Sequence, residues 1–147
     1  MPLHTSHTAL KATPQEAFDY LTTPACWHEW HAASLGTVPD RRVPQGQGAT
    51  FDENIRTAGF HRRLHWRVIA AQRPHYWEAL ATMNDGSGVR LRYDFAASSE
   101  GTVFTRTLDY SVKPLWLRVI DAVFGRFRIR VESAIALRKL QGYFEPT

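Results

Sequence analysis

Between residues 35 and 113 apolar and polar positions mostly alternate with a period of two, the pattern of half-buried β-strands. Short turn-forming stretches such as Ala58-Gly59, Asn84–Gly88 and Ser98–Gly101 separate the pieces. Because these connectors are short enough for hairpins, consecutive strands are predicted to pair antiparallel as a meander. The predicted strands are 35–38, 49–57, 60–72, 76–83, 89–97 and 102–113, after an edge strand at 3–11. In the strand at 76–83 the inward face is left undecided, since Trp77-Ala79-Ala81 and Tyr76-Glu78-Leu80 are both plausible.

Helical signals stand on both sides of this region. The segment Thr13–Glu16 is a capping box with proline at the first helical position, and Thr23-Pro24 repeats that start for a second short helix closed by Trp30 and His31. From Pro114 to about Phe144 apolar residues recur at spacings of three and four, which predicts one long amphipathic helix. The predicted stripe is Leu117, Ile120, Phe124, Phe127, Val131, Ala134 and Leu137 or Leu140. Its apolar stripe needs a broad concave surface, and the predicted sheet supplies one.

The order of these elements, strand, two short helices, meander and long terminal helix, is that of the helix-grip fold. Local stretches agree with one family of that fold: Pro14–Leu21, Trp27–Ser34, Gly48–Phe51, Trp66–Val68 and Gly101–Arg106. On these stretches the chain resembles the START-like (SRPBCC) superfamily, of the polyketide cyclase/dehydrase and lipid-transport type. The resemblance implies a single α+β domain over residues 1–147, START-like and Bet v 1-like, in which a curved antiparallel sheet and the C-terminal helix enclose a cavity. It carries over no universal catalytic residue.

Composition narrows the partners that the chain can have. Aromatic residues make up 12% of the chain, more ring surface than so small a core requires, which favours a cavity lined by rings. The net charge is +4, but no run of five like charges appears, so we expect no nucleic-acid partner. No stretch approaches eighteen consecutive apolar residues, so we expect no integral membrane association; a homodimer is left open.

The single cysteine, Cys26, excludes an intramolecular disulfide and any zinc site built from several thiolates. With no signal-like N-terminus, it predicts a cytoplasmic protein. His28 and His31 lie three apart, but no third ligand accompanies them, so no metal is expected. The sequence holds no nucleotide or flavin motif, and no cofactor is expected.

Two charged residues fall on predicted inward faces, Glu53 in the strand at 49–57 and Arg106 in the strand at 102–113. In one interpretation they pair with each other, or reach solvent at the rim, and hold the shape of the cavity. In another, Arg106 binds a ligand oxyanion or phenolate, and Glu53 acts as an acid or base with a pKa raised by burial. A register shift of one residue turns both outward instead.

Three functions remain open. The first is binding of a small hydrophobic molecule, such as a lipid, polyketide or aromatic metabolite. The second is a polyketide cyclase/dehydratase-type enzyme with Arg106 and Glu53 as catalytic residues. The third is an interaction domain that uses a basic strand face around His61 and His65.

His31 is either a proton shuttle or a residue favoured by the helix dipole. The predicted ligand-binding residues are Trp30, His31, Phe51, Trp66, Tyr93, Tyr110, Phe124 and Phe127.

Overall fold

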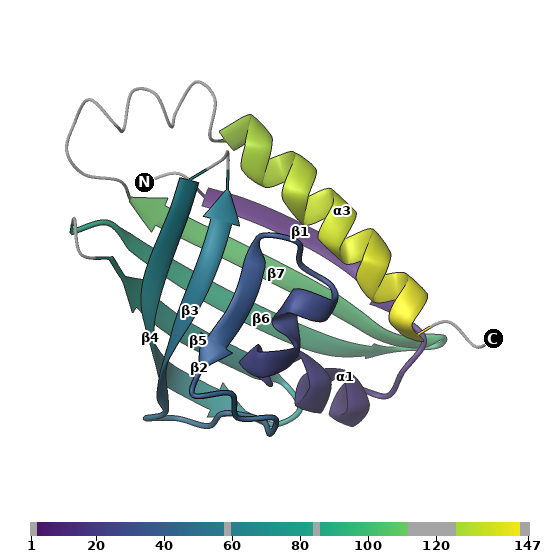
Figure 1. Ribbon diagram of the computed structural model, residues 1–147. Coiled ribbons are helices and arrows are strands. Elements are labelled where there is room, and N and C mark those ends of the chain that lie inside the picture. Colours follow the sequence, from purple (N-terminus) through teal and green to yellow (C-terminus); the bar gives the residue numbers. More distant parts are fainter. Residues whose placement is uncertain (1–2, 58–59, 84–85, 112–125, 145–147) are drawn as a thin grey trace.

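Seven strands form one curved antiparallel sheet in the order β1-β7-β6-β5-β4-β3-β2 (Figure 1). The computed structural model describes residues 3–57, 60–83, 86–111 and 126–144. Every pair of neighbouring strands is antiparallel, so the predicted meander is confirmed, with β1 joining at the β7 edge. The strands are β1 (Leu3–Leu10), β2 (Ser34–Val38), β3 (Thr50–Thr57), β4 (Phe60–Gln72), β5 (Tyr76–Thr82), β6 (Gly88–Ser98) and β7 (Gly101–Ser111).

Both short helices begin at their predicted Thr-Pro steps, but only the first has a side-chain cap, since the Thr23 hydroxyl donates to the Asp19 carbonyl instead. At the start of α1 (Pro14–Leu21), the Thr13 hydroxyl accepts the Glu16 backbone N–H at 3.1 Å and donates to the Glu16 carboxylate at 3.0 Å. The second helix, η1 (Pro24–Glu29), is a 3₁₀ helix of six residues, with Trp30 as its C-cap. Helix α1 contacts β6 and β7, and η1 contacts β2, so both close one end of the sheet.

The C-terminal helix α3 (Arg126–Phe144) lies along β1 and against the inner face of the sheet (Figure 1). The predicted start of this helix at Pro114 lies outside the described residues. Over the described turns the buried positions are Ser133, Ala136, Leu137 and Leu140. The prediction that Ala134 belongs to the buried stripe is wrong: Ser133 takes that place, because its hydroxyl meets a buried arginine of the sheet.

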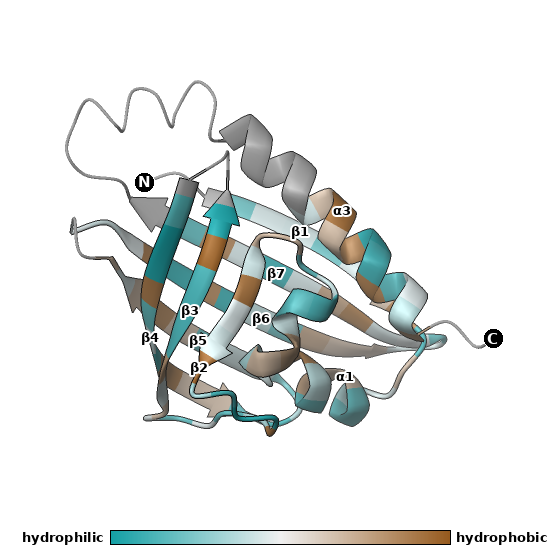
Figure 2. Cartoon of the chain, viewed as in Figure 1, coloured by the Kyte–Doolittle hydropathy of each residue, from teal (hydrophilic) through white to brown (hydrophobic). Residues whose placement is uncertain are grey.

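The inner face of the sheet is set by the alternation read from the sequence. Apolar and polar positions alternate in bands along β3 and β4 (Figure 2). The sequence left the inward face of β5 undecided. In the structure Trp77, Ala79 and Ala81 are all buried and Leu80 is exposed, so the first three define the inward face. The inward residues on the other strands include Phe51, Glu53, Leu64, Trp66, Val68, Leu91, Tyr93, Phe95, Phe104 and Arg106. A register shift that would turn Glu53 and Arg106 outward is therefore excluded.

Trp27 of η1 stands at the centre of this inner face. Its indole N–H donates to the Leu21 carbonyl at 2.8 Å, which fixes the ring across the sheet. The ring meets four others edge-on, at centroid distances of 5.8 to 6.3 Å: Phe51, Trp66, Trp77 and Tyr93. Part of the aromatic surface that predicted a cavity lining is therefore used to pack the core beneath η1.

Candidate functional site

The two inward charges lie on the same inner face but on separate strands, Glu53 on β3 and Arg106 on β7, and each has an aromatic neighbour on the adjoining strand. Tyr93 on β6 pairs directly with Arg106 on β7, and Trp66 on β4 pairs with Phe51, two residues before Glu53 on β3. Because cross-strand partners in an antiparallel pair share a face, the register places Tyr93 beside Arg106 and Trp66 beside the strand that carries Glu53. Ser133 reaches the group from α3. We call Ser34, Glu53, Tyr93, Arg106, Ser133 and His31 the polar cluster.

Glu53 is a buried carboxyl group, with 5% of the residue exposed. Its Oε1 accepts the Trp66 indole N–H at 2.9 Å. Burial raises the pKa of Glu53 to about 7, and the nearby Ser34 hydroxyl, the Trp66 N–H and the Arg106 charge offset only part of that rise. At neutral pH both the acid and its conjugate base are therefore populated, so the group can give or take a proton.

Arg106 is a buried cation, with 8% of the residue exposed. One terminal nitrogen, Nη1, donates to Ser133 Oγ at 3.0 Å, and Nη2 lies 3.5 Å from His31 Nε2. Its Nε is buried and meets no acceptor among the residues described. None of the salt bridges within the described ranges includes Arg106, so the predicted Glu53–Arg106 ion pair does not form there.

His31 follows η1 and closes the cluster from the helical side. Its Nδ1 accepts the Ala33 backbone N–H at 3.2 Å. Burial, together with the positive charge of Arg106, lowers the pKa of His31 to about 3. The imidazole is thus neutral at physiological pH, which argues against the hypothesis that it shuttles a proton there.

Burial also acts on Tyr93, whose residue is only 1% exposed. It raises the pKa of the phenol above its usual range, partly opposed by the charge of Arg106 and by a hydrogen bond with it. Tyr93 therefore stays a neutral phenol, able to donate or accept a hydrogen bond but not to serve as a base at neutral pH.

The structure also places Phe51, Trp66 and Trp30, three more of the predicted ligand-binding residues. All three are buried on or against the inner face, and the Trp30 indole N–H has no described acceptor. The side chains of Tyr110 and Phe127, and all of Phe124, lie outside the described residues. Two members of the cluster, Ser34 and Ser133, were not singled out from the sequence. The stripe read from the sequence passed through Ala134, so the pattern gave no signal for its neighbour Ser133.

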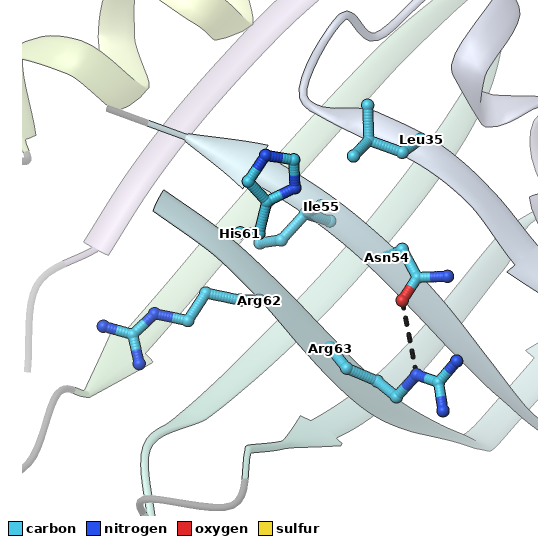
Figure 3. Close-up of a pocket in the computed structure, with 6 residues that line it drawn as sticks. All are labelled: Leu35, Asn54, Ile55, His61, Arg62 and Arg63. Atoms are coloured by element: carbon cyan, nitrogen blue, oxygen red, sulfur yellow. Dashed lines mark hydrogen bonds between the residues drawn. The ribbon is translucent and has the colours of Figure 1, made fainter. Parts of the chain in front are cut away.

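A groove of about 490 Å³ lies beside the edge strand β2 (Figure 3). The residues that line it come from β2, β3 and β4: Leu35, Asn54, Ile55, His61, Arg62 and Arg63. Ile55 packs against the core, so the groove adjoins the inner face at that point. Its polar groups are partly occupied with one another, since Arg63 Nε donates to the Asn54 amide oxygen at 3.3 Å.

The basic strand face predicted around His61 and His65 is present on the outer side of β4, where both residues are exposed with Arg63 and Arg67. The face is not purely basic, because His65 Nδ1 lies 2.8 Å from a carboxylate oxygen of Asp52. On β5, Glu78 is buried and forms salt bridges with Arg90 and Arg92. Acids thus interrupt the basic surface of the sheet, which weakens the case for an anionic partner on it.

The architecture of a curled antiparallel sheet around a C-terminal helix is that of START-like and Bet v 1-like proteins. The chain belongs to the polyketide cyclase/dehydrase and lipid transport family, whose model matches residues 2–145. A search of the curated proteins gives no significant match. No helix in the described ranges is long and apolar enough to cross a membrane.

Solved structures agree on the fold. The di-domain ARO/CYC StfQ from the steffimycin biosynthetic pathway is 18% identical, with a TM-score of 0.74 over 97% of this chain and 50% of that one. A START superfamily protein from Mycobacterium smegmatis is 12% identical, with a TM-score of 0.71 over 97% and 96%. A protein from Thermus thermophilus is 12% identical, with a TM-score of 0.79 over 96% and 95%. At these identities the likeness concerns the fold alone.

Proposed function

We propose that the protein binds a small hydrophobic molecule, a lipid, polyketide or aromatic metabolite, between the inner face of the sheet and the C-terminal helix. The observation that carries the proposal is the polar cluster: buried hydrogen-bond donors on an otherwise apolar face have no partner among the residues that the structure describes. Arg106 forms no ion pair with a described carboxylate, and a buried charge without a counter-charge costs roughly several kcal/mol compared with an apolar residue, so a ligand that brings one would explain its place there. Family membership supports the same conclusion.

We propose that the protein works in the cytoplasm and has no nucleic-acid partner and no integral membrane association. The lone Cys26 is consistent with a reducing compartment. The Cys26 thiol is poorly suited to act as a nucleophile, since burial raises its pKa and the nearby Glu29 charge raises it further. A homodimer is compatible with the exposed edge strand β2, where Leu35 and Val38 are both more than half exposed.

A ligand that binds only the folded protein raises its stability. At a concentration about 100 times its Kd, a matching ligand should add about 2.7 kcal/mol and raise the melting temperature by roughly 5–10 °C. We expect this from at least one member of a panel of fatty acids, quinones and aromatic polyketides, measured by differential scanning calorimetry. If no compound shifts the melting temperature, the binding function is wrong and the interaction-domain hypothesis gains.

A second function, a cyclase/dehydratase-type enzyme without a cofactor, is favoured by one observation: the pKa of Glu53 lies near 7. In this proposal Glu53 removes a proton from carbon next to a ligand carbonyl and later returns it to the leaving oxygen. Arg106 would stabilise the enolate that forms in between. Because Glu53 and Arg106 are not paired with each other, both remain able to face a substrate.

For that enzyme, Glu53→Gln and Arg106→Leu should each lower turnover of an accepted substrate by about 100-fold or more. Arg67→Leu, on the exposed outer face, serves as the matched control and should leave turnover unchanged. Turnover is followed by loss of the substrate's absorption, with ligand affinity measured in parallel. If these variants bind and turn over substrate like the wild type, Glu53 and Arg106 are not catalytic residues, and only the binding function remains.

A further inference from the structure

The polar cluster and the adjoining Trp30 are rich in donors and poor in acceptors. Arg106 Nε and Trp30 Nε1 are both buried without a hydrogen-bond partner in the described residues. Ser34 Oγ also has no partner in good hydrogen-bonding geometry there, although it lies close enough to Glu53 to lower the pKa of that carboxyl. Buried donors that lack acceptors are rare in folded proteins, because each costs about 1–3 kcal/mol. Such a set favours a molecule that brings acceptor oxygens.

His31 adds a further donor. Of its two ring-nitrogen contacts, the shorter is that of Nδ1 with the Ala33 N–H at 3.2 Å, and this contact selects the neutral tautomer with the ring proton on Nε2. That Nε2–H lies 3.5 Å from Arg106 Nη2, which carries only protons as well. Two donors cannot form a hydrogen bond with each other, so the His31 Nε2–H and the Arg106 Nη2 protons lie side by side without satisfying one another. A single oxygen atom in front of them could accept from both.

Resting on the proposed binding function, we infer that the ligand carries one anionic oxygen group, a carboxylate or a phenolate, which Arg106 and His31 Nε2–H bind together. The charge balance supports an anion over a neutral carbonyl. Arg106 has no salt bridge to a described carboxylate, and Glu53, the nearest acid of the cluster, is protonated for much of the time at neutral pH. In a site shielded from water, charge-assisted bonds are about twice as strong as neutral ones.

The test compares matched pairs that differ only in the head group. The probes are 2-naphthoate against 2-naphthalenemethanol, and dodecanoate against dodecanol, titrated calorimetrically at about pH 6, where Glu53 is mostly protonated and the carboxylates are mostly ionised. Wild type should bind one carboxylate at least about tenfold more tightly than its alcohol. Arg106→Met should bring this ratio to about one while the affinity for the alcohol stays within about twofold.

A third probe, 2-naphthol, separates the two anion sources. If the site selects a phenolate, bound naphthol shows the red-shifted absorption of its anion at a pH where free naphthol is neutral. Arg67→Met removes a positive charge from the exposed outer face and should leave every ratio unchanged, which isolates the local effect. If Arg106→Met does not fold, His31→Leu is the substitute, and it should lower the carboxylate preference severalfold.

The outcomes separate this inference from the binding function. If wild type binds the alcohols as tightly as the carboxylates and naphthol stays neutral when bound, the anion inference is overturned and apolar binding stands. Binding of neutral members of the panel, such as quinones, without binding of the anionic probes or of any fatty acid overturns it in the same way, with water as the partner of the unpaired donors. If neither these probes nor the panel bind, the proposed function itself is wrong.

Discussion

Replacing Trp27 with alanine should lower the free energy of unfolding by about 3–5 kcal/mol, the cost of emptying a large aromatic site in a packed core. Trp27 is 4% exposed, and its ring contacts four aromatic residues of β3, β4, β5 and β6. The variant also loses the bond to the Leu21 carbonyl, which ties η1 to the end of α1. Urea or guanidinium unfolding, followed by circular dichroism, measures the change.

Leu80→Ala is a suitable control, because Leu80 is 41% exposed on the outer face of β5. Its effect should stay within about 0.5 kcal/mol. Trp27→Phe should fall between the two, since it keeps a ring but loses the hydrogen bond. If Trp27→Ala lowers the free energy of unfolding by less than about 1 kcal/mol, the ring is not packed in the core and instead borders a space that solvent or ligand can fill.

The second large effect is a pH dependence of stability that comes from Glu53. Its pKa is 4.5 in the unfolded chain and about 7 in the folded one, so the folded protein holds this proton more tightly. Stability must then fall as the pH rises from about 4.5 to about 7, and level off above, with a total change of about 3 kcal/mol. Below about pH 4.5 the carboxyl is protonated in both states and contributes no slope.

Glu53→Gln isolates this contribution, because glutamine resembles the protonated acid and does not titrate. The difference in unfolding free energy between wild type and Glu53→Gln should move in the variant's favour by about 3 kcal/mol between about pH 4 and pH 8. All other titrating groups largely cancel in that difference. Parallel curves across this range would contradict a buried, proton-holding Glu53, and the enzyme hypothesis would lose its base.

The sequence predicted the strands and their faces well, because alternation with a period of two is a local property. It assigned Glu53 and Arg106 to the inner face, where both are buried. It left β5 undecided because both of its faces carry apolar residues. The structure shows why: Glu78, on the outer face, is covered by Arg90 and Arg92, so a charged residue is buried on the side away from the core.

The partners of the inward charges could not be predicted. The bond from Trp66 to Glu53 depends on register and side-chain rotamer, and the contact of Arg106 with Ser133 joins residues 27 positions apart through the phase of α3. That phase differs from the predicted stripe, which chose Ala134. The perturbed pKa values of Glu53 and His31 come from burial, which only the assembled fold defines.

Native mass spectrometry of the protein purified from its own source organism tests the central claim most directly. The binding function predicts a population heavier than the 16.8 kDa chain by the mass of one small molecule, which denaturation releases and chromatography shows to be hydrophobic. Identification of that molecule then gives the substrate class to examine for turnover. A protein that carries nothing and binds no lipid, quinone or aromatic polyketide would contradict the account and favour an interaction domain.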